Sequence, residues 1–307
     1  MPFQPAYEVP AERQAYTFHA QPREGWGRIG CLMLHGFMGS PSSSRDMGEY
    51  LAQNGVTVHC PLLPGHGNLP YHIHKISRHD WIAEAEEGLQ TLGQYCDQIF
   101  LIGHSMGAVL SAHLAQKTKD ICGLILLAPL YDVPDWRIKM SLFGRYIMPW
   151  FYPLKRKDVD RDIFVGRVLD FNPDLDPNDP ALDDYFYEAS RLPMDGIDEM
   201  RKMANLGRKL WPRTFQPVII FQGGHDPAVN SGNTEKLFQK IGAADKEMKF
   251  FPKVGHELMR PVEPIHQKVW QKILEFIEDH SEFGQKTPTP LNAPSLLVPK
   301  REDGRFR

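Results

Sequence analysis

Residues 103–107 read GHSMG, and the serine between the two glycines is a candidate catalytic nucleophile. The preceding run QIFLIG is short, β-branched and aromatic, which predicts a buried strand, while the following AVLSAHLAQKT has the apolar spacing of a helix. At such a sharp bend the serine has a strained backbone, and a side chain two residues away on either side would collide with the neighbouring chain. The bend exposes the hydroxyl of Ser105 and points the helix N-terminus at the reacting centre. A surface Gly-Ser turn is the alternative interpretation, which the flanking patterns disfavour.

Ser105 needs a base that accepts its proton and a third group that orients the base, because a free hydroxyl is a weak nucleophile. In open α/β sheets ligands bind beyond the carboxyl ends of the strands, so both partners should follow strand ends. The run VIIFQGGHDPAVN presents Asp226 after a predicted strand, and KFFPKVGHEL presents His256 in the same way. His256 is therefore the candidate base and Asp226 the candidate orienting carboxylate. The alternative for Asp226 is a turn or helix-capping role, since Asp-Pro favours turns.

A tetrahedral intermediate also needs hydrogen-bond donors for its negatively charged oxygen, which form an oxyanion hole. One expected donor is the backbone N–H of Met106, the residue after the nucleophile. The other is the backbone N–H of Phe37, in the loop HGFMGSP that follows the predicted strand CLML. A lining role for the Phe37 side chain is compatible with this assignment, because the donor belongs to the main chain.

The chain has 13 histidines that compete for the role of base. His35 and His104 adjoin the two functional loops, but their sequence positions place them beside the nucleophile. The run GHGNLPYHIHKISRH gathers four others, and its His-x-His pair could hold a metal ion. Because no cysteine or carboxylate stands nearby at ligand spacing, we predict no metal site. A polar loop near the pocket mouth is the alternative interpretation of this histidine group, which comprises His66, His72, His74 and His79.

Apolar runs alternate with helical patterns along most of the chain, which predicts an α/β fold with a mostly parallel, doubly wound sheet. The runs are almost continuously hydrophobic, as expected of strands that are buried on both faces. The predicted strands are RIGCLMLHG, VTVHCPLLPG, QIFLIGHS, GLILLAPL, PVIIFQGG and EMKFFPKVGH. The predicted helices span residues 43–54, 80–95, 108–118, 233–241 and 264–280.

This alternation breaks between residues 131 and 215, which contain 14 of the chain's 33 aromatic residues (17 Phe, 6 Trp and 10 Tyr). Residues 195–210 have the spacing of an amphipathic helix. Because a structureless insertion of this length is implausible in a compact domain, we interpret the segment as a helical cap over the carboxyl edge of the sheet. Trp150 and Phe151, within MPWFYP, are the candidates for an apolar substrate pocket. The alternative is that the aromatic residues only form the cap's own core.

The predicted organisation has four parts. Residues 1–28 are an N-terminal lead-in, residues 29–130 and 216–280 form the α/β core, and residues 131–215 form the cap. Residues 281–307 are proline-rich and end in charges, which predicts a flexible tail. Packing of the tail's PSLLVP segment on the body is the alternative.

Composition excludes several classes of function. A net charge of −3 without a basic stripe gives no reason to expect a nucleic-acid partner. The 4 cysteines stand outside any CxxC pattern, which favours reduced, buried thiols and a cytoplasmic location. The N-terminal stretch MPFQPAYEVPAERQAY lacks the apolar region of a secretory signal. No run reaches the roughly 18 apolar residues that a membrane-spanning helix needs.

Five motifs, in the order HGFMGSP, PLLPGHG, GHSMGA, GGHDPAV and VGHEL, resemble those of the α/β-hydrolase superfamily. Within it they are most similar to the carboxylesterase and monoacylglycerol-lipase group with a small cap, and the order Ser105, Asp226, His256 is that of the superfamily. The resemblance extends over residues 30–280 and is weakest across the cap. It implies ester hydrolysis through an acyl-enzyme without a metal or organic cofactor. The polar segment FHAQPREGWGRIG departs from the pattern and leaves the first strands undefined, while the long cap leaves the substrate size open.

The sequence thus predicts a cytoplasmic serine hydrolase of small carboxylic esters with an apolar acyl chain, such as a monoacylglycerol. We also expect transient contact of the aromatic cap with a membrane surface. Thioesterases, acyltransferases and C–C bond hydrolases use the same triad and are the enzymatic alternatives. Dehalogenases and epoxide hydrolases of this fold need aspartate at the bend, so Ser105 argues against them. A non-catalytic binding protein is the alternative from another class, which an intact triad disfavours.

Overall fold

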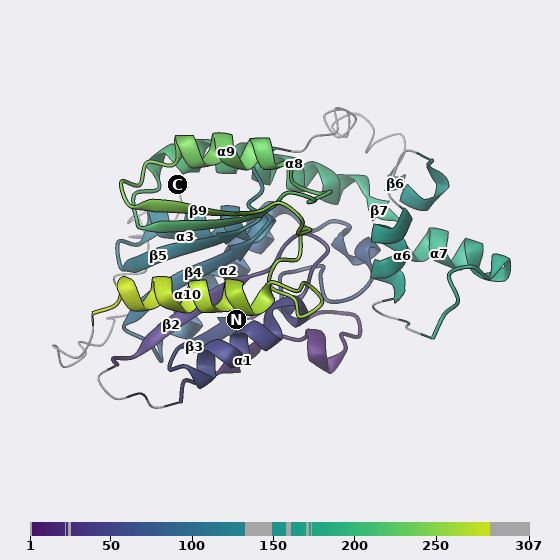
Figure 1. Cartoon of the computed structure of the whole chain (residues 1–307). Coiled ribbons are helices and arrows are strands. Elements are labelled where there is room, and N and C mark those ends of the chain that lie inside the picture. The colour runs from purple at the N-terminus through teal and green to yellow at the C-terminus, as the bar shows by residue number, and fades with distance from the viewer. Residues whose placement is uncertain are drawn as a thin grey trace, which may run out of the picture.

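A seven-stranded sheet forms the centre of the molecule in the computed structural model, which describes residues 2–282 except 22, 24–25, 133–148, 158–160, 170–171 and 173. The strands of this sheet are β1 Tyr16–Phe18, β2 Ile29–Leu34, β3 Thr57–Cys60, β4 Gln98–His104, β5 Ile121–Leu127, β8 Val218–Gly223 and β9 Lys246–Phe251. Their order is β1-β3-β2-β4-β5-β8-β9, and all neighbours are parallel except the pair β1 and β3 (Figure 1). The predicted mostly parallel, doubly wound sheet is confirmed.

Helices cover both faces of this sheet (Figure 1). Helices α1 and α10 lie together on one face, and α2, α3 and α9 pack on the other. The five helices are α1 Arg45–Gln53, α2 Arg78–Gly93, α3 Met106–Lys117, α9 Ser231–Lys240 and α10 His266–Asp279. All five were predicted from the sequence, with ends that differ by one or two residues.

Strand β2 shows why its sequence is continuously apolar. All six of its residues are buried, and alternate side chains enter different cores. Ile29, Cys31 and Met33 pack in the core beneath α1 and α10, whereas Leu32 and Leu34 pack in the core beneath α2 and α3. Because side chains of a strand alternate between faces, a sheet covered on both sides needs an apolar residue at every position.

The two outer strands differ from the sequence-based prediction. Strand β9 was expected to be buried on both faces, but it lies at the end of the strand order. None of its six residues is buried, and Glu247 and Phe250 are exposed. This expectation was wrong because the strand contains charged residues as well as apolar ones, and Glu247 and Lys249 pair with each other at the surface. Strand β1 was not predicted at all, and it adds three residues of the lead-in to the opposite edge.

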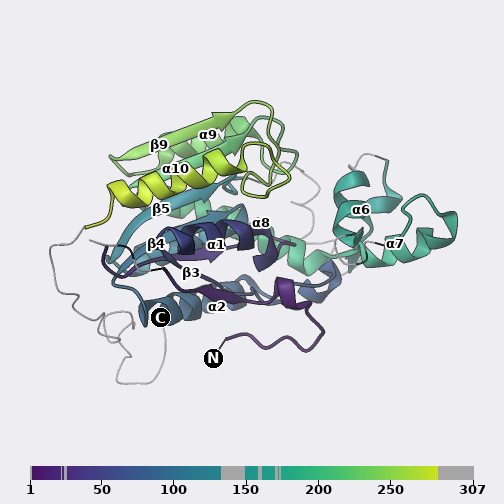
Figure 2. The same ribbon diagram turned by 60° about the horizontal axis from the view of Figure 1, so that its bottom comes forward.

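The segment that was predicted to form the cap lies between β5 and β8, and its described elements project to one side of the core in both views (Figures 1 and 2). Its described elements are β6 Trp150–Phe151, α6 Arg161–Leu169, α7 Asp183–Ala189, β7 Leu192–Pro193 and α8 Met194–Leu210. Helices α6 and α7 pack together in a small core, which includes Phe186 of α7 and Leu154 from the preceding segment. Residues 133–148 of the predicted cap and 283–307 of the predicted tail lie outside the described part of the chain.

Helix α8 joins the cap to the core. It was predicted over residues 195–210 and packs against α3, the helix that begins after Ser105. Met203 is fully buried there, while Met200 and Leu206 are partly buried against the same core. A Cβ on Gly207 would lie 3.0 Å from Cγ2 of Val109, so the two helix backbones are close. The expected amphipathic face of this helix is confirmed.

Two further expectations bear on the class of protein. All four cysteines are free, and Cys31, Cys60 and Cys96 are buried while Cys122 is half-buried. In the described residues we find no helix with the length and hydrophobicity that crossing a membrane requires.

Candidate active site

Ser105 occupies the sharp turn between β4 and α3, where its backbone has φ 53° and ψ −112°. This left-handed φ is costly for a residue with a Cβ, by roughly 1–3 kcal/mol. Main-chain hydrogen bonds hold it there: the N–H of Ser105 donates to the carbonyl of Leu127 at 2.9 Å, and the N–H of Leu130 donates to the carbonyl of Ser105 at 3.1 Å. The end of β5 and the loop that follows it therefore fix the position of Ser105.

Gly103 and Gly107, which flank Ser105, lie so close to backbone atoms that no side chain would fit at either position. A Cβ on Gly107 would lie 1.9 Å from the carbonyl oxygen of Leu34, and one on Gly103 would lie 2.5 Å from Cα of Ala108. Neither distance is compatible with a side chain, since backbone atoms form both contacts. The collisions predicted from the sequence are confirmed.

Asp226 and His256 meet beyond the carboxyl ends of β8 and β9. Nδ1 of His256 lies 2.7 Å from Oδ2 of Asp226. The Asp226 side chain is fully buried, and the His256 side chain is 15% exposed. Glycines allow the two loops to approach, because a Cβ on Gly223 would lie 2.3 Å from the carbonyl oxygens of Val254 and Gly255.

Asp226 is held as a carboxylate despite its burial. Burial alone would raise its pKa, but the hydrogen bond with His256 and the N–H groups of Val229 and Ala228, both at 2.8 Å, lower the pKa below its ordinary value. A buried anion beside Nδ1 fixes the N–H of His256 on that nitrogen, which leaves Nε2 free to accept a proton.

Gln222, a buried residue of β8, supports Asp226 and was not among the predicted site residues. Its Nε2 donates to Oδ2 of Asp226 at 3.2 Å, and its Oε1 accepts a 2.7 Å hydrogen bond from the hydroxyl of Thr234. Both Gln222 and Thr234 are fully buried. The only sequence signal was a polar residue inside an apolar strand.

The loop after β2 passes directly beside Ser105. A Cβ on Gly36 would lie 3.1 Å from Cβ of Ser105, so the main chain that leads to Phe37 runs against Ser105. His35 holds this loop: its Nδ1 donates to the carbonyl of Gly36 at 3.0 Å and its Nε2 accepts from the N–H of Leu63 at 3.2 Å. The Phe37 ring packs edge-on against Trp81, with centroids 6.0 Å apart.

Met106 is the first residue of α3, so its N–H belongs to the group of donors that have no partner within the helix. The positive end of the helix dipole is at the same place. The loop at Gly36 and the start of α3 thus lie on two sides of Ser105.

The four clustered histidines have separate surroundings. His66 is buried and Nδ1 donates to the carbonyl of Pro64 at 2.9 Å, and burial lowers its pKa to about 4. His72 stacks on Tyr7 with ring centroids 3.9 Å apart, and Nδ1 of His74 lies 3.0 Å from Asp195. His79 is exposed. Among the described residues, no three His, Cys, Asp or Glu side chains form a group that could hold a metal ion.

Trp150 and Phe151 form β6, which pairs with β7 at the base of the cap. Both are half-buried. The Trp150 ring lies 4.4 Å from the guanidinium carbon of Arg191 and 5.2 Å from the ring of His74. Trp150 therefore stands at the seam between the cap and the loop that carries the clustered histidines.

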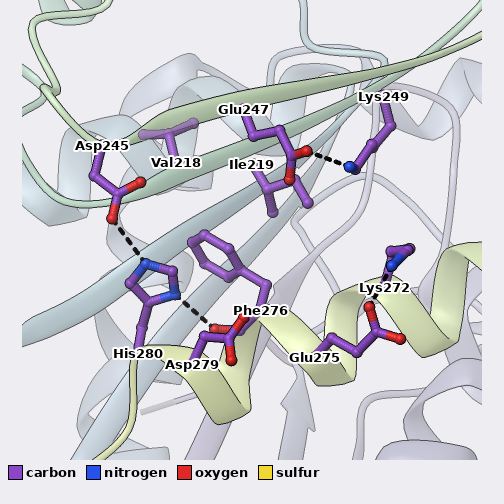
Figure 3. Close-up of a pocket in the computed structure, with 10 residues that line it drawn as sticks. All are labelled: Val218, Ile219, Asp245, Glu247, Lys249, Lys272, Glu275, Phe276, Asp279 and His280. Carbon is purple, nitrogen blue, oxygen red and sulfur yellow. Dashed lines mark hydrogen bonds and ion pairs between the residues drawn. The ribbon is translucent and has the colours of Figure 1, made fainter.

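A surface hollow of about 370 Å³ lies away from these residues, near the amino ends of β8 and β9 (Figure 3). Six of its ionisable side chains form pairs: His280 with Asp245 at 3.0 Å, Lys272 with Glu275 at 2.5 Å, and Lys249 with Glu247. Since ligands of such sheets bind at the opposite, carboxyl edge, this hollow is not the candidate active site.

Comparison with known proteins gives a consistent assignment. The family model described as "Serine aminopeptidase, S33" matches residues 28–263. A thermostable monoacylglycerol lipase from Bacillus sp. (strain H-257) is 32% identical over 242 residues, which cover 78% of this chain and 86% of that protein. A carboxylesterase from Bacillus subtilis (strain 168) is 22% identical over 80% of this chain and 91% of its own.

Solved structures share the fold. The chain is similar to a structure reported for the metagenome-derived lipolytic enzymes LipS and LipT, with a TM-score of 0.71, 22% identity, and coverage of 89% of this chain and 100% of that chain. It is also similar to a soluble variant of monoglyceride lipase from Saccharomyces cerevisiae, with a TM-score of 0.68, 17% identity, and coverage of 92% and 99%.

Proposed function

Because the chain belongs to the α/β-hydrolase family described as serine aminopeptidase S33, we propose that it is a serine hydrolase of carboxylic esters with an apolar acyl chain, and that a monoacylglycerol is its type of substrate. The relative with 32% identity is named a monoacylglycerol lipase, and a more distant relative is named a carboxylesterase. Both names denote ester hydrolysis, and the aromatic cap suits an apolar acyl chain.

In the first half of the proposed reaction, Oγ of Ser105 attacks the ester carbonyl while Nε2 of His256 accepts the hydroxyl proton. Asp226 holds the imidazole and stabilises its positive charge. The N–H groups of Phe37 and Met106 donate to the oxyanion. When the tetrahedral intermediate collapses, the C–O bond to the alcohol breaks, and His256 returns the proton to the leaving alkoxide, which leaves an acyl group on Ser105.

The second half repeats these steps with water. His256 takes a proton from a water molecule, whose oxygen attacks the acyl carbonyl of Ser105. Collapse of the second tetrahedral intermediate releases the carboxylic acid, and the proton returns to Oγ of Ser105. The residues are unchanged at the end, so the cycle requires only ester and water.

One observation supports this proposal most strongly, the 2.7 Å hydrogen bond between Nδ1 of His256 and the fully buried carboxylate of Asp226. Burying a carboxylate is costly unless it is paired, and here its main partner is an imidazole at the strand ends next to Ser105. This pairing fixes the tautomer and the orientation of the imidazole, which is what a general base requires.

The proposal is tested with a panel of p-nitrophenyl esters from acetate to palmitate, monoacylglycerols of matching length, acyl-CoA thioesters and an aminoacyl p-nitroanilide. We expect turnover of the esters, a preference for medium or long acyl chains, and covalent labelling of Ser105 by a fluorophosphonate. Higher kcat/KM on the thioesters or the anilide would replace the proposed substrate class, and failure of the labelling would overturn the serine mechanism.

The proposed setting of the reaction is the cytoplasm, with transient contact between the cap and a lipid surface that supplies the substrate. Four free thiols fit a reducing compartment. Sedimentation with phosphatidylcholine vesicles containing monoacylglycerol tests the lipid contact, and recovery of all the protein in the supernatant would contradict it.

A further inference from the structure

His104 connects the strand that ends at the nucleophile with the loop that carries the proposed base. It is the last residue of β4, directly before Ser105, and is 5% exposed. Its Nε2 lies 3.1 Å from the main-chain carbonyl oxygen of His256. The two imidazole rings are 4.5 Å apart between centroids, and their planes are inclined by 48°.

The partner atom determines the protonation of His104. A carbonyl oxygen can only accept a hydrogen bond, so Nε2 of His104 carries the hydrogen. Burial lowers the pKa of His104 to about 4, and the nearby His256 acts in the same direction, while the carboxylates of Glu257 and Asp226 oppose the shift. The ring is therefore a neutral donor at the pH values where His256 can act as a base.

The loop that carries His256 depends on such contacts. It connects β9, which ends at Phe251, with α10, which begins at His266, and all of its residues are described and none is in a helix or strand. The N–H of His225 donates to the carbonyl of Val254 at 3.0 Å, which ties the loop to the one that carries Asp226. The bond from His104 ties it to the nucleophile's strand.

We propose that His104 is a positioning residue, whose hydrogen bond to the His256 carbonyl and ring contact with His256 keep the base aligned with Ser105. The proposal rests on the proposed function, since it concerns the same reaction. His104 is a poor acceptor for the serine proton, because its Nε2 already donates to a carbonyl and burial holds the pKa of its ring at about 4. Misplacement of a reacting group by about 1 Å can lower a rate by about 100-fold, so this alignment matters.

The test compares His104→Phe, which keeps a ring but removes the donor, with His104→Gln, whose amide N–H can reach the same carbonyl. His59 gives matched controls, because it is also buried in the sheet, has a pKa lowered to about 4 by burial, and bonds through Nδ1 to the Thr17 hydroxyl at 2.8 Å, away from the site. Each variant is measured for kcat, KM, fluorophosphonate labelling rate and urea unfolding.

For folded His104→Phe we expect kcat and the labelling rate to fall together by about 10- to 100-fold, with KM within about twofold of wild type. His104→Gln should recover most of this loss, and His59→Phe and His59→Gln should keep wild-type kcat at a similar cost in stability. Unchanged kcat in His104→Phe, equal losses in the Phe and Gln variants, or similar losses in the His59 variants would overturn the proposal.

A measurement on the wild-type enzyme keeps the test decisive if His104→Phe fails to fold. Nitrogen-15 NMR of labelled histidines, assigned with His104→Gln, should show His104 as the neutral Nε2–H tautomer from pH 5 upward, and an Nδ1–H tautomer would overturn the proposal. If wild-type Ser105 is not labelled by the fluorophosphonate, the proposed function fails. Labelling of wild type with an equal rate in His104→Phe refutes only the role of His104.

Discussion

Replacing Ser105 with alanine removes the Oγ that the proposed mechanism uses and keeps the strained turn, because alanine also has a Cβ at this φ of 53°. We expect the variant to fold with wild-type stability and to lose on the order of 10⁴- to 10⁶-fold in kcat. Ester turnover by the purified variant and its urea unfolding curve check both parts. More than a few per cent residual activity would rule out Ser105 as the nucleophile.

His256 and Asp226 should give a simple pH dependence. The pKa of Asp226 lies below its ordinary value, so Asp226 remains a carboxylate at mildly acidic and neutral pH. We therefore expect kcat/KM to rise with pH through one ionisation, because a general base acts only in its unprotonated form.

A pH profile with a short-chain ester measures this, with Asp226→Asn as the matched variant. That variant should retain its fold and lose on the order of 10⁴-fold in kcat, because the imidazole is no longer held in the correct tautomer. Two ionisations on the acidic limb of the wild-type profile would contradict the assignment of a permanently charged Asp226.

At the scale of residues, the sequence predicts where the candidate catalytic side chains lie, but it does not predict which other residues hold them in place. Ser105, Asp226 and His256 could be chosen because each follows a predicted strand, and parallel strands end at one edge. The role of Gln222 was beyond reach, because an amide in an apolar strand has many structural explanations. The contact of His104 with His256 was also not predicted, because it depends on the path of an irregular loop far along the chain.

The cap elements carry the prediction about acyl chain length. Each buried CH₂ of an acyl chain contributes about 0.8 kcal/mol, so kcat/KM should rise with chain length until the pocket is full and then fall. Replacing Trp150 and Phe151 with alanine should flatten this dependence, mainly through KM, and spare acetate esters. The ester panel measures it.

The contacts of Trp150 with Arg191 and His74 define the competing outcome. If the two rings only hold the cap to the core, the double variant will lose activity equally on short and long esters and melt at a lower temperature. Phe186, in the small core of α6 and α7, supplies a control. Its alanine variant should destabilise the cap without changing the chain-length preference of the remaining activity.

The elements themselves were predictable where they are long and periodic. Six of the seven strands of the main sheet and the helices α1, α2, α3, α8, α9 and α10 follow from apolar runs and helical spacing. Strands β1, β6 and β7 contain two or three residues each, and backbone pairing defines them without a side-chain pattern. The edge position of β9 could not be read from its sequence, because strand order depends on contacts between distant segments.

For the whole molecule, buried histidines predict acid sensitivity. Burial lowers the pKa of His59, His66 and His104 to about 4, whereas an unfolded histidine titrates near 6.5. Between these values the unfolded chain binds more protons, so stability is full above about pH 6.5 and falls toward pH 4, by up to about 1.4 kcal/mol per pH unit for each histidine.

Urea unfolding between about pH 7 and pH 5 measures this fall, and His59→Gln should reduce its slope. A free energy of unfolding that is constant over this range would contradict the assignment of these three rings as neutral in the folded protein.

Chelation should leave the molecule unaffected. The proposed mechanism uses no metal, and in the described residues the clustered histidines have separate partners. We expect the same kcat and melting temperature before and after dialysis against EDTA. Inhibition by EDTA that zinc reverses would support a metal at the His72 and His74 loop.

The strained turn at Ser105 makes the recovery of activity during refolding depend on complete assembly of the sheet. Gly107 lies against the carbonyl of Leu34 from β2, and the N–H of Ser105 bonds to Leu127 at the end of β5, so the strained φ is stable only when both neighbouring strands are in register. A partly assembled sheet would let the turn relax and would bury the hydroxyl or misdirect it. Fluorophosphonate labelling after dilution from urea should therefore reappear with the slowest kinetic phase, later than the recovery of helical circular dichroism.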